Sequence, residues 1–195
     1  MKCFVFPLTH ANLFPLTTKP LNIFEPRYLQ MVEDSLETKT PIALAYVPEN
    51  GDTYRSIAGF GLPQVIDQRP NDTLLIFLPG QGKIRILQED TSDTKPYLIA
   101  ECEIVVENLE VDESLKPKYM TLSKLLVQWV QKHIPDAEQR DIFIRSLKGP
   151  QEIVSAFAAY LIRDYDLQYE MMEIFNINDQ IRYLHRLYES NELTI

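Results

Sequence analysis

The chain has 195 residues, a formal net charge of −9, and a composition that is 45% hydrophobic and 24% charged. This length allows one large domain or two small ones, and no apolar run approaches the roughly 18 residues of a membrane-spanning helix. A nucleic-acid-binding protein usually presents a basic surface to phosphates. The acidic balance therefore argues against DNA as a partner and makes RNA the weaker expectation.

The N-terminus and the cysteines indicate the compartment. The first residues, MKCFVFPLTH, lack the apolar core of a secretory signal. Cys3 and Cys102 are the only cysteines and belong to no CxxC motif, as expected in a reducing compartment, although a disulfide between them stays an open alternative. We therefore expect a cytoplasmic protein that is not embedded in a membrane and that holds no metal and no cofactor.

The composition changes once along the chain, near residue 110. Residues 1–110 contain short β-type segments separated by proline and glycine, which predicts a β-rich domain. Residues 111–195 show helical periodicity, which predicts a second, helical domain. Many short strands with such turns indicate a compact antiparallel barrel, so the fold class is α+β. The predicted strands are Lys2–Phe6, Leu21–Phe24, Pro41–Val47, Tyr54–Phe60, Leu62–Asp67, Thr73–Pro79, Lys83–Gln88 and Tyr97–Val106.

The stretch LNIFEPRY predicts a strand that ends where a helix begins. Pro26 suits the first turn of a helix, where its missing N–H costs nothing, and Glu25 places negative charge near the helix N-terminus. Arg27 can reach a carboxylate or carbonyl groups of the adjoining sheet through its planar fork. We therefore interpret this motif first as a structural joint, made of Phe24, Glu25, Pro26, Arg27 and Tyr28.

The helix that starts at Pro26 has two predicted faces. The apolar face comprises Tyr28, Leu29, Val32 and Leu36. The opposite, exposed face comprises Arg27, Gln30, Asp34 and Glu37, with Met31 at its edge. A second interpretation of the region is therefore a surface that binds a partner, made of Arg27, Gln30, Met31 and Asp34. Catalysis is the weakest interpretation.

The second half predicts consecutive short helices that pack as a bundle. One apolar face comprises Leu122, Leu125, Leu126, Trp129 and His133, and later helices carry Ile153, Val154, Phe157 and Leu161, then Ile181, Leu184 and Tyr188. Asp136, with Gln139 three residues later, predicts a helix start, and Gly149-Pro150 predicts a stop followed by a start. The predicted N-caps of the last two helices are Asp166 and Asn178.

No pattern predicts catalysis. His10, His133 and His185 fall in different segments with no carboxylate or cysteine at ligand spacing. The segment Gly80-Gln81-Gly82-Lys83 lacks the spacing of a phosphate-binding loop and is interpreted as a β-turn. Asp164 and Asp166 are better explained as a helix end followed by an N-cap than as a metal pair. No catalytic and no metal-binding residue is predicted.

Several segments in series resemble the LON substrate-binding domain, the N-terminal domain of ATP-dependent Lon proteases. They are Phe6-Pro7-Leu8, Leu13-Phe14-Pro15, Ile23-Phe24-Glu25-Pro26-Arg27-Tyr28, Gly80-x-x-Lys83-Ile84-Arg85-Ile86 and Pro96-Tyr97-Leu98-Ile99-Ala100-Glu101. The resemblance implies a PUA-like β-barrel followed by an α-helical bundle. Two departures stand out: Leu16 takes the place of a usual glycine, and Gly59-Phe60 takes the place of a usual Gly-Thr.

In Lon, this region helps to capture unfolded or tagged proteins. We therefore expect a non-catalytic module that binds unfolded polypeptide or a protein partner, such as a protease or a chaperone, through apolar grooves. We expect neither ATPase nor protease activity, because Walker motifs and a Ser-Lys protease domain are absent from these 195 residues. The alternative is an RNA-binding PUA-like module that uses Lys83 and Arg85 as a basic strip. A small-molecule enzyme with its site in a barrel cleft is a third, weaker reading, and the oligomeric state stays undetermined.

Overall fold

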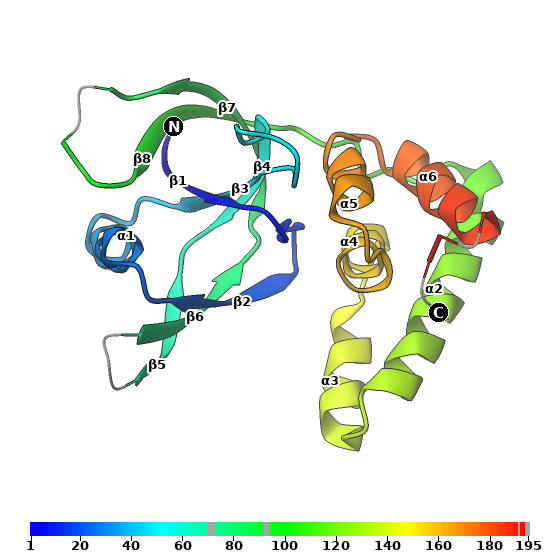
Figure 1. Cartoon of the computed structure of the whole chain (residues 1–195). Helices are drawn as coiled ribbons and strands as arrows, with labels where there is room; N and C mark the ends of the chain where they lie inside the picture. Colours follow the sequence, from blue (N-terminus) through cyan, green and yellow to red (C-terminus); the bar gives the residue numbers. More distant parts are fainter. Residues whose placement is uncertain (70–72, 92–93, 191, 194–195) are drawn as a thin grey trace. The chain divides into compact units, whose positions relative to one another are not determined.

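The computed structural model describes residues 1–69, 73–91, 94–190 and 192–193. The chain divides into two compact units, Met1–Val105 and Val106–Ile195. The first unit is built mainly from strands and the second from helices (Figure 1).

The strands of the first unit lie close to the positions that the sequence predicts. Their bounds are β1 Lys2–Leu8, β2 Thr18–Ile23, β3 Ile42–Tyr46, β4 Ile57–Gly61, β5 Gln64–Arg69, β6 Thr73–Pro79, β7 Gly82–Glu89 and β8 Leu98–Ile104. The early helix α1 spans Pro26–Thr38 and begins at the predicted proline. The remaining segments of this unit are turns and loops.

The first unit contains a closed barrel and a separate small sheet. The barrel has the strand order β1-β3-β4-β7-β8 and closes through the antiparallel pair β8–β1, and the sheet has the order β2-β6-β5 (Figure 1). The predicted barrel is confirmed, with one difference: β1 pairs with β3 in parallel. A parallel pair needs a crossover connection, and here the chain passes through β2 and α1 between the two strands.

The strands β1 and β3 separate two apolar cores, because alternate side chains point to opposite faces. Toward the barrel interior lie mostly small side chains, such as Val5, Ala43 and Ala45. On the other face Phe4 and Leu44 join a second core, which includes residues of α1 and the small sheet. Both strands are therefore buried on two sides and read as continuous apolar runs. Cys3 and Cys102 are free thiols in the barrel core, without the disulfide that the sequence left open.

Two glycines let the loop after β1 lie directly on the barrel. A Cβ at Gly59 would be 1.8 Å from the carbonyl oxygen of Leu13, and one at Gly80 would be 2.2 Å from that of Phe14. The turn ends at Leu16, whose φ of 59° is in the left-handed region that L-residues seldom adopt. The Leu16 N–H donates to the Gly80 carbonyl at 2.8 Å and ties this loop to the segment between β6 and β7. A left-handed residue explains why glycine is usual at this position in the family that the sequence resembles.

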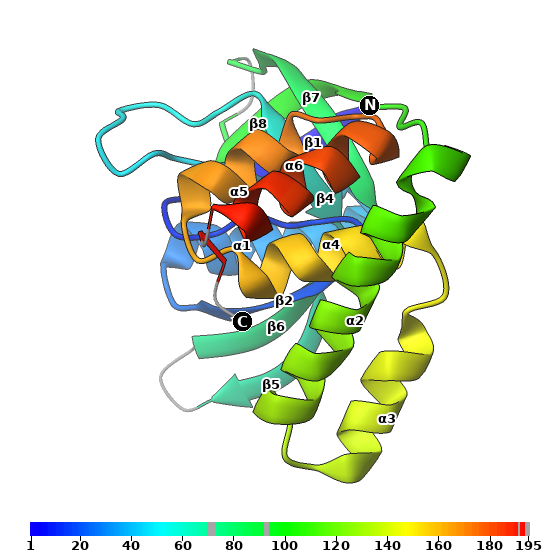
Figure 2. The ribbon, with the colours of Figure 1, turned by 90° about the vertical axis from the view of Figure 1, so that its right-hand side faces the viewer.

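The second unit is a bundle of short helices. The bounds are η1 Glu113–Leu115, α2 Lys116–His133, α3 Ala137–Ser146, α4 Pro150–Leu161, α5 Tyr165–Met172 and α6 Ile177–Glu189. Helix α2 contacts α4 and α6, and the chain turns back after α2 so that α3 lies beside it (Figure 2). The buried stripe of α2 is Leu122, Leu126 and Val130, while Trp129 and His133 stack on each other with ring centroids 4.6 Å apart. The predicted stripe is therefore partly wrong: the buried side chain of its last turn is Val130.

The helix starts agree with the sequence in two places and differ in two. Asp136 accepts a hydrogen bond from the Gln139 N–H, and Pro150 occupies the first turn of α4, both as predicted. The last two N-caps are instead Asp164 and Asn176, each two residues before the predicted one. Asn178 lies in the first turn of α6 and is buried, and its side chain forms hydrogen bonds with the backbone of Glu110 and Asp112.

No helix within the described residues combines the length and the apolar character that crossing a membrane requires.

Candidate functional site

The junction between β2 and α1 is a rigid turn. β2 ends at Ile23, and Phe24, which was predicted to close that strand, is 68% exposed. Glu25 occupies the N-cap with extended backbone, and its carbonyl accepts hydrogen bonds from the N–H groups of Tyr28 and Leu29. Pro26 follows in the first turn. A strand therefore ends and a helix begins within this stretch, and its role as a structural joint stays a prediction.

Arg27 folds back on this joint and does not reach the adjoining sheet. Its Nε and Nη2 both donate to Oε2 of Glu25, at 2.9 and 2.7 Å. Its guanidinium lies over the ring of Tyr28, 4.8 Å from the centroid. Arg27 is thus held in one orientation by an ion pair and a cation–π contact, with half of its side chain exposed.

The other predicted partner-binding residues differ in how exposed they are to solvent. Gln30 is exposed and Asp34 is partly buried. Met31 is 0% exposed, so the expectation that it lies at the edge of an exposed stripe is wrong. The buried stripe of α1 is Tyr28, Met31, Val32 and Ser35, whereas Leu36 of the predicted apolar face is 37% exposed. The stripe is rotated because the hydroxyl of Ser35 is satisfied by the Thr40 carbonyl at 2.7 Å, which allows a polar residue at a core position.

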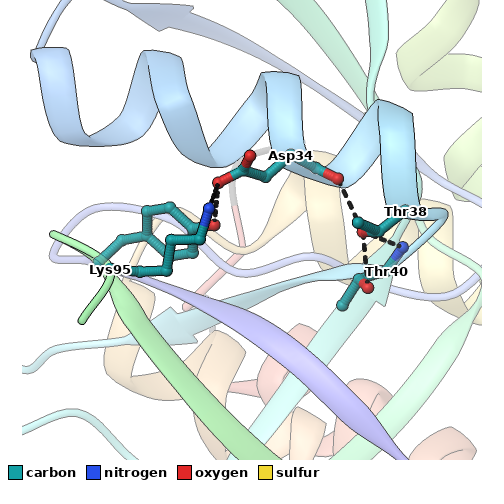
Figure 3. Close-up of polar contacts among 5 residues, drawn as sticks. Asp34, Thr38, Thr40 and Lys95 are labelled. Carbon is teal, nitrogen blue, oxygen red and sulfur yellow. Dashed lines mark hydrogen bonds and ion pairs between the residues drawn. The ribbon is translucent and has the colours of Figure 1, made fainter. Parts of the chain in front are cut away.

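Asp34 connects α1 to the segment before β8. Its Oδ2 accepts hydrogen bonds from Lys95 Nζ, at 2.8 Å, and from the hydroxyl of Tyr97 (Figure 3). At the end of the helix the Thr38 hydroxyl donates to the Asp34 carbonyl and is also hydrogen-bonded to the Thr40 hydroxyl (Figure 3). Asp34 therefore fixes two side chains that lie about sixty positions later in the sequence, and its predicted role as a partner contact stays a prediction.

The Asp34 contacts predict a pH-dependent contribution to stability. Hydrogen bonds from Lys95 and Tyr97 lower the pKa of Asp34 below its usual value of 3.8. A lowered folded-state pKa stabilises the fold above the unfolded pKa, and this contribution is lost as the pH falls through the folded value. We expect Asp34→Asn to lower the free energy of unfolding at pH 7 by about 1 kcal/mol, with the difference from the native chain shrinking below about pH 4. Urea denaturation of both proteins at several pH values measures this, and an equal difference at every pH would contradict it.

A groove of about 340 Å³ opens beside the joint in the first unit. Its lining comes from three segments: Val5 and Pro7 of β1, Arg27 and Tyr28 of α1, and residues 95–98 before and within β8. Each of the three segments overlaps a stretch that carries the family resemblance. The pairing of β1 with β8 and the Asp34 contacts bring these distant segments together.

Aromatic pairs make the walls of the groove rigid. The ring of Tyr28 packs on Phe6 with centroids 4.3 Å apart, and the ring of Tyr97 packs edge-on against Phe4 at 5.0 Å. Tyr28 is 9% exposed and Tyr97 is 7% exposed. Because both rings are anchored in the core, the groove presents a preformed surface.

The basic strip expected for RNA binding is not present as predicted. Lys83 is 2% exposed, so only Arg85 of the pair lies at the surface. Lys83 and Ile84 are both buried, although they point to opposite faces of β7, because this strand is covered on both sides at its start. Among the described residues no group of three or more histidine, cysteine, aspartate or glutamate side chains could hold a metal ion.

Some aromatic side chains of the first unit are buried and others are exposed. Phe14 and Phe60 belong to the core, whereas Phe24 and Phe77 are 68% and 36% exposed. The groove residues contributed by β1 and by residues 95–98 were missed as a site. The family resemblance of the two segments could have pointed to these residues, but only the fold brings them next to Arg27 and Tyr28.

The described fold, a β-barrel unit and a helical-bundle unit in one chain, can be compared with known proteins. The family model of the ATP-dependent protease La (LON) substrate-binding domain matches residues 2–189. The chain belongs to this LON substrate-binding domain family.

Related proteins and structures agree with this assignment. The chain is 23% identical over 188 residues to the Lon protease of Dictyoglomus thermophilum, a match that covers 91% of this chain and 23% of that protein. It is 27% identical over 120 residues to Lon protease 2 of Sorangium cellulosum, covering 57% of this chain and 15% of that one. The chain therefore spans about a quarter or less of the length of these relatives.

Two solved structures share the fold. The N-terminal domain of the Mycobacterium avium complex Lon protease superposes with a TM-score of 0.72 and 16% identity, covering 97% of this chain and 98% of that one. A Lon N-terminal domain protein from Xanthomonas campestris gives a TM-score of 0.68 and 16% identity, covering 94% and 96%. Similarity at this level of identity establishes the fold alone.

Proposed function

We propose that this chain is a non-catalytic module that binds unfolded polypeptide, or a protein partner such as a protease or a chaperone, in the groove between β1, α1 and residues 95–98. The observation that carries the proposal is the convergence of three distant segments on one preformed groove. Family membership supports the class of ligand, since the family is defined by substrate binding in an ATP-dependent protease.

The lining suits a polypeptide ligand. Pro7 and Pro96 provide apolar surface, and Leu98 adds an aliphatic side chain at the start of β8. Tyr28 and Tyr97 add aromatic carbon to the lining, and tyrosine is enriched where proteins bind other proteins. Because these rings are anchored in the core, a ligand pays little for ordering the site.

The proposal is tested by placing a charge on the exposed apolar rim. Pro96 is exposed and precedes β8, so Pro96→Asp should leave the fold intact while replacing an apolar part of the lining with a carboxylate. We expect the native chain to bind a permanently unfolded model protein without ATP, and Pro96→Asp to weaken this binding about tenfold or more. Isothermal titration calorimetry with a reduced, alkylated protein as ligand measures both affinities.

Pro20→Asp is the matched control. Pro20 is likewise exposed, lies on β2, and does not line the groove. The control should bind like the native chain. Equal loss in both variants, or no binding by the native chain, would contradict the assignment of the groove.

A further inference from the structure

We propose that the groove recognises the C-terminal residue of a polypeptide, with its α-carboxylate on Arg27 and its apolar side chain against the floor formed by Pro7 and Leu98. This inference rests on the proposed function and deepens it, because it names the part of the ligand chain that the groove selects.

The charge of the lining differs from that of the unit around it. Residues 1–105 carry nine basic and thirteen acidic side chains. The groove is lined by two basic side chains, Arg27 and Lys95, and by no acidic one. The carboxylates that pair with these cations, Glu25 and Asp34, are not part of the lining. An anionic group is therefore the complementary occupant of this rim in an otherwise acidic unit.

Arg27 keeps hydrogen-bond donors for a ligand. A guanidinium carries five N–H donors, and the ion pair uses one on Nε and one on Nη2, both directed to the same oxygen of Glu25. The donors of Nη1 and the second donor of Nη2 have no acceptor among the described residues. These two nitrogens form one edge of the guanidinium fork, which matches a carboxylate in the bidentate geometry. The stacking of the guanidinium on Tyr28 keeps that fork in place.

The size of the groove favours a chain end over an internal acidic residue. Its volume of about 340 Å³ lies near the lower limit of pockets that hold small ligands, so it accommodates one or two residues. A C-terminal residue carries its carboxylate and its side chain on the same Cα and supplies both groups at once. An internal Asp or Glu would need a neighbouring apolar residue, with chain continuing in both directions out of the groove.

The test compares peptides that differ only in the terminal group. The probe is a fluorescein-labelled decapeptide of Gly, Ser and Asn that ends in leucine, prepared with a free carboxylate and with a carboxamide. A third peptide places Glu-Leu internally and ends in a carboxamide. Fluorescence anisotropy with the full chain should show the free carboxylate binding about fivefold or more tighter than either other peptide. Added salt should reduce this difference, since half of the Arg27 side chain is exposed.

Arg27→Gln and Arg55→Gln form the matched pair of variants. Both substitutions remove one positive charge, and Arg55 is exposed and does not line the groove. Arg27→Gln should abolish the preference for the free carboxylate, and Arg55→Gln should retain it. Equal binding of the carboxylate and the carboxamide would overturn the inference while leaving a peptide-binding groove intact. Tighter binding of the internal Glu-Leu peptide would overturn the choice of the chain end, and no binding of any peptide would remove the proposed function as well.

Discussion

Replacing Gly59 with alanine should lower the free energy of unfolding by about 3 kcal/mol. The added Cβ would lie 1.8 Å from the carbonyl oxygen of Leu13 and 2.8 Å from its Cβ, so β4 and the loop after β1 would have to separate. No rotamer change relieves a clash with backbone. The cause is space and not backbone conformation, because Gly59 does not have a positive φ. Chemical denaturation followed by circular dichroism measures the loss.

Gly51→Ala is the control for this prediction. The atoms nearest to a Cβ at Gly51 would be side-chain atoms of Pro48, at 3.3–3.4 Å, which is close to ordinary contact. We expect a change within about 0.5 kcal/mol. If Gly59→Ala were equally mild, the loop containing Leu13 would not rest on β4 as described.

Replacing Met31 with alanine should cost about 3 kcal/mol of stability. Met31 is 0% exposed and lies in the second core of the first unit with Ile23, Ile76 and Leu78. Truncation removes most of the side chain and leaves a cavity that this close-packed region cannot fully close. The substitution should leave the affinity of the remaining folded protein for polypeptide nearly unchanged, since Met31 does not line the groove.

Gln30→Ala is the control for this prediction, because Gln30 belongs to the exposed face that the sequence predicts for this helix. Gln30 is the exposed neighbour of Met31 on the same helix, and alanine is a good helix former, so its substitution should change stability by less than about 0.5 kcal/mol. Thermal unfolding of both variants gives the comparison. A mild Met31→Ala together with a severe Gln30→Ala would mean that α1 presents the opposite face to the sheet.

The error at Met31 has a physical origin in the sequence. A helix buries positions i, i+3, i+4 and i+7, which here are Tyr28, Met31, Val32 and Ser35. Ser35 is polar, so the sequence favours a stripe that includes Leu29 and Leu36 in its place. The serine is tolerated because its hydroxyl bonds to the carbonyl of Thr40 across the helix end, and that partner becomes visible only in the folded chain.

The N-caps of the last helices illustrate the same limit. Asp164 and Asp166, like Asn176 and Asn178, offer two capping residues separated by one position. Either member of a pair can cap a helix by local chemistry. In the second unit Asn178 instead bonds to Glu110 and Asp112, residues almost seventy positions away, and the helix therefore begins earlier. Asp136, which has no such competitor, is predicted correctly.

The stretch LNIFEPRY by itself determined a strand end, a helix that starts at Pro26 and a charged joint, because these depend on neighbours within a few residues. The strand periodicity and the turns likewise determined a β-rich half and a helical half. Only the tertiary structure decided that Met31 is buried and that residues 95–98 lie beside α1 to form a groove. The place of residues 95–98 depends on the pairing and register of β1 with β8, and the burial of Met31 depends on the core that α1 shares with β1, β3 and the small sheet. Local propensities specify neither.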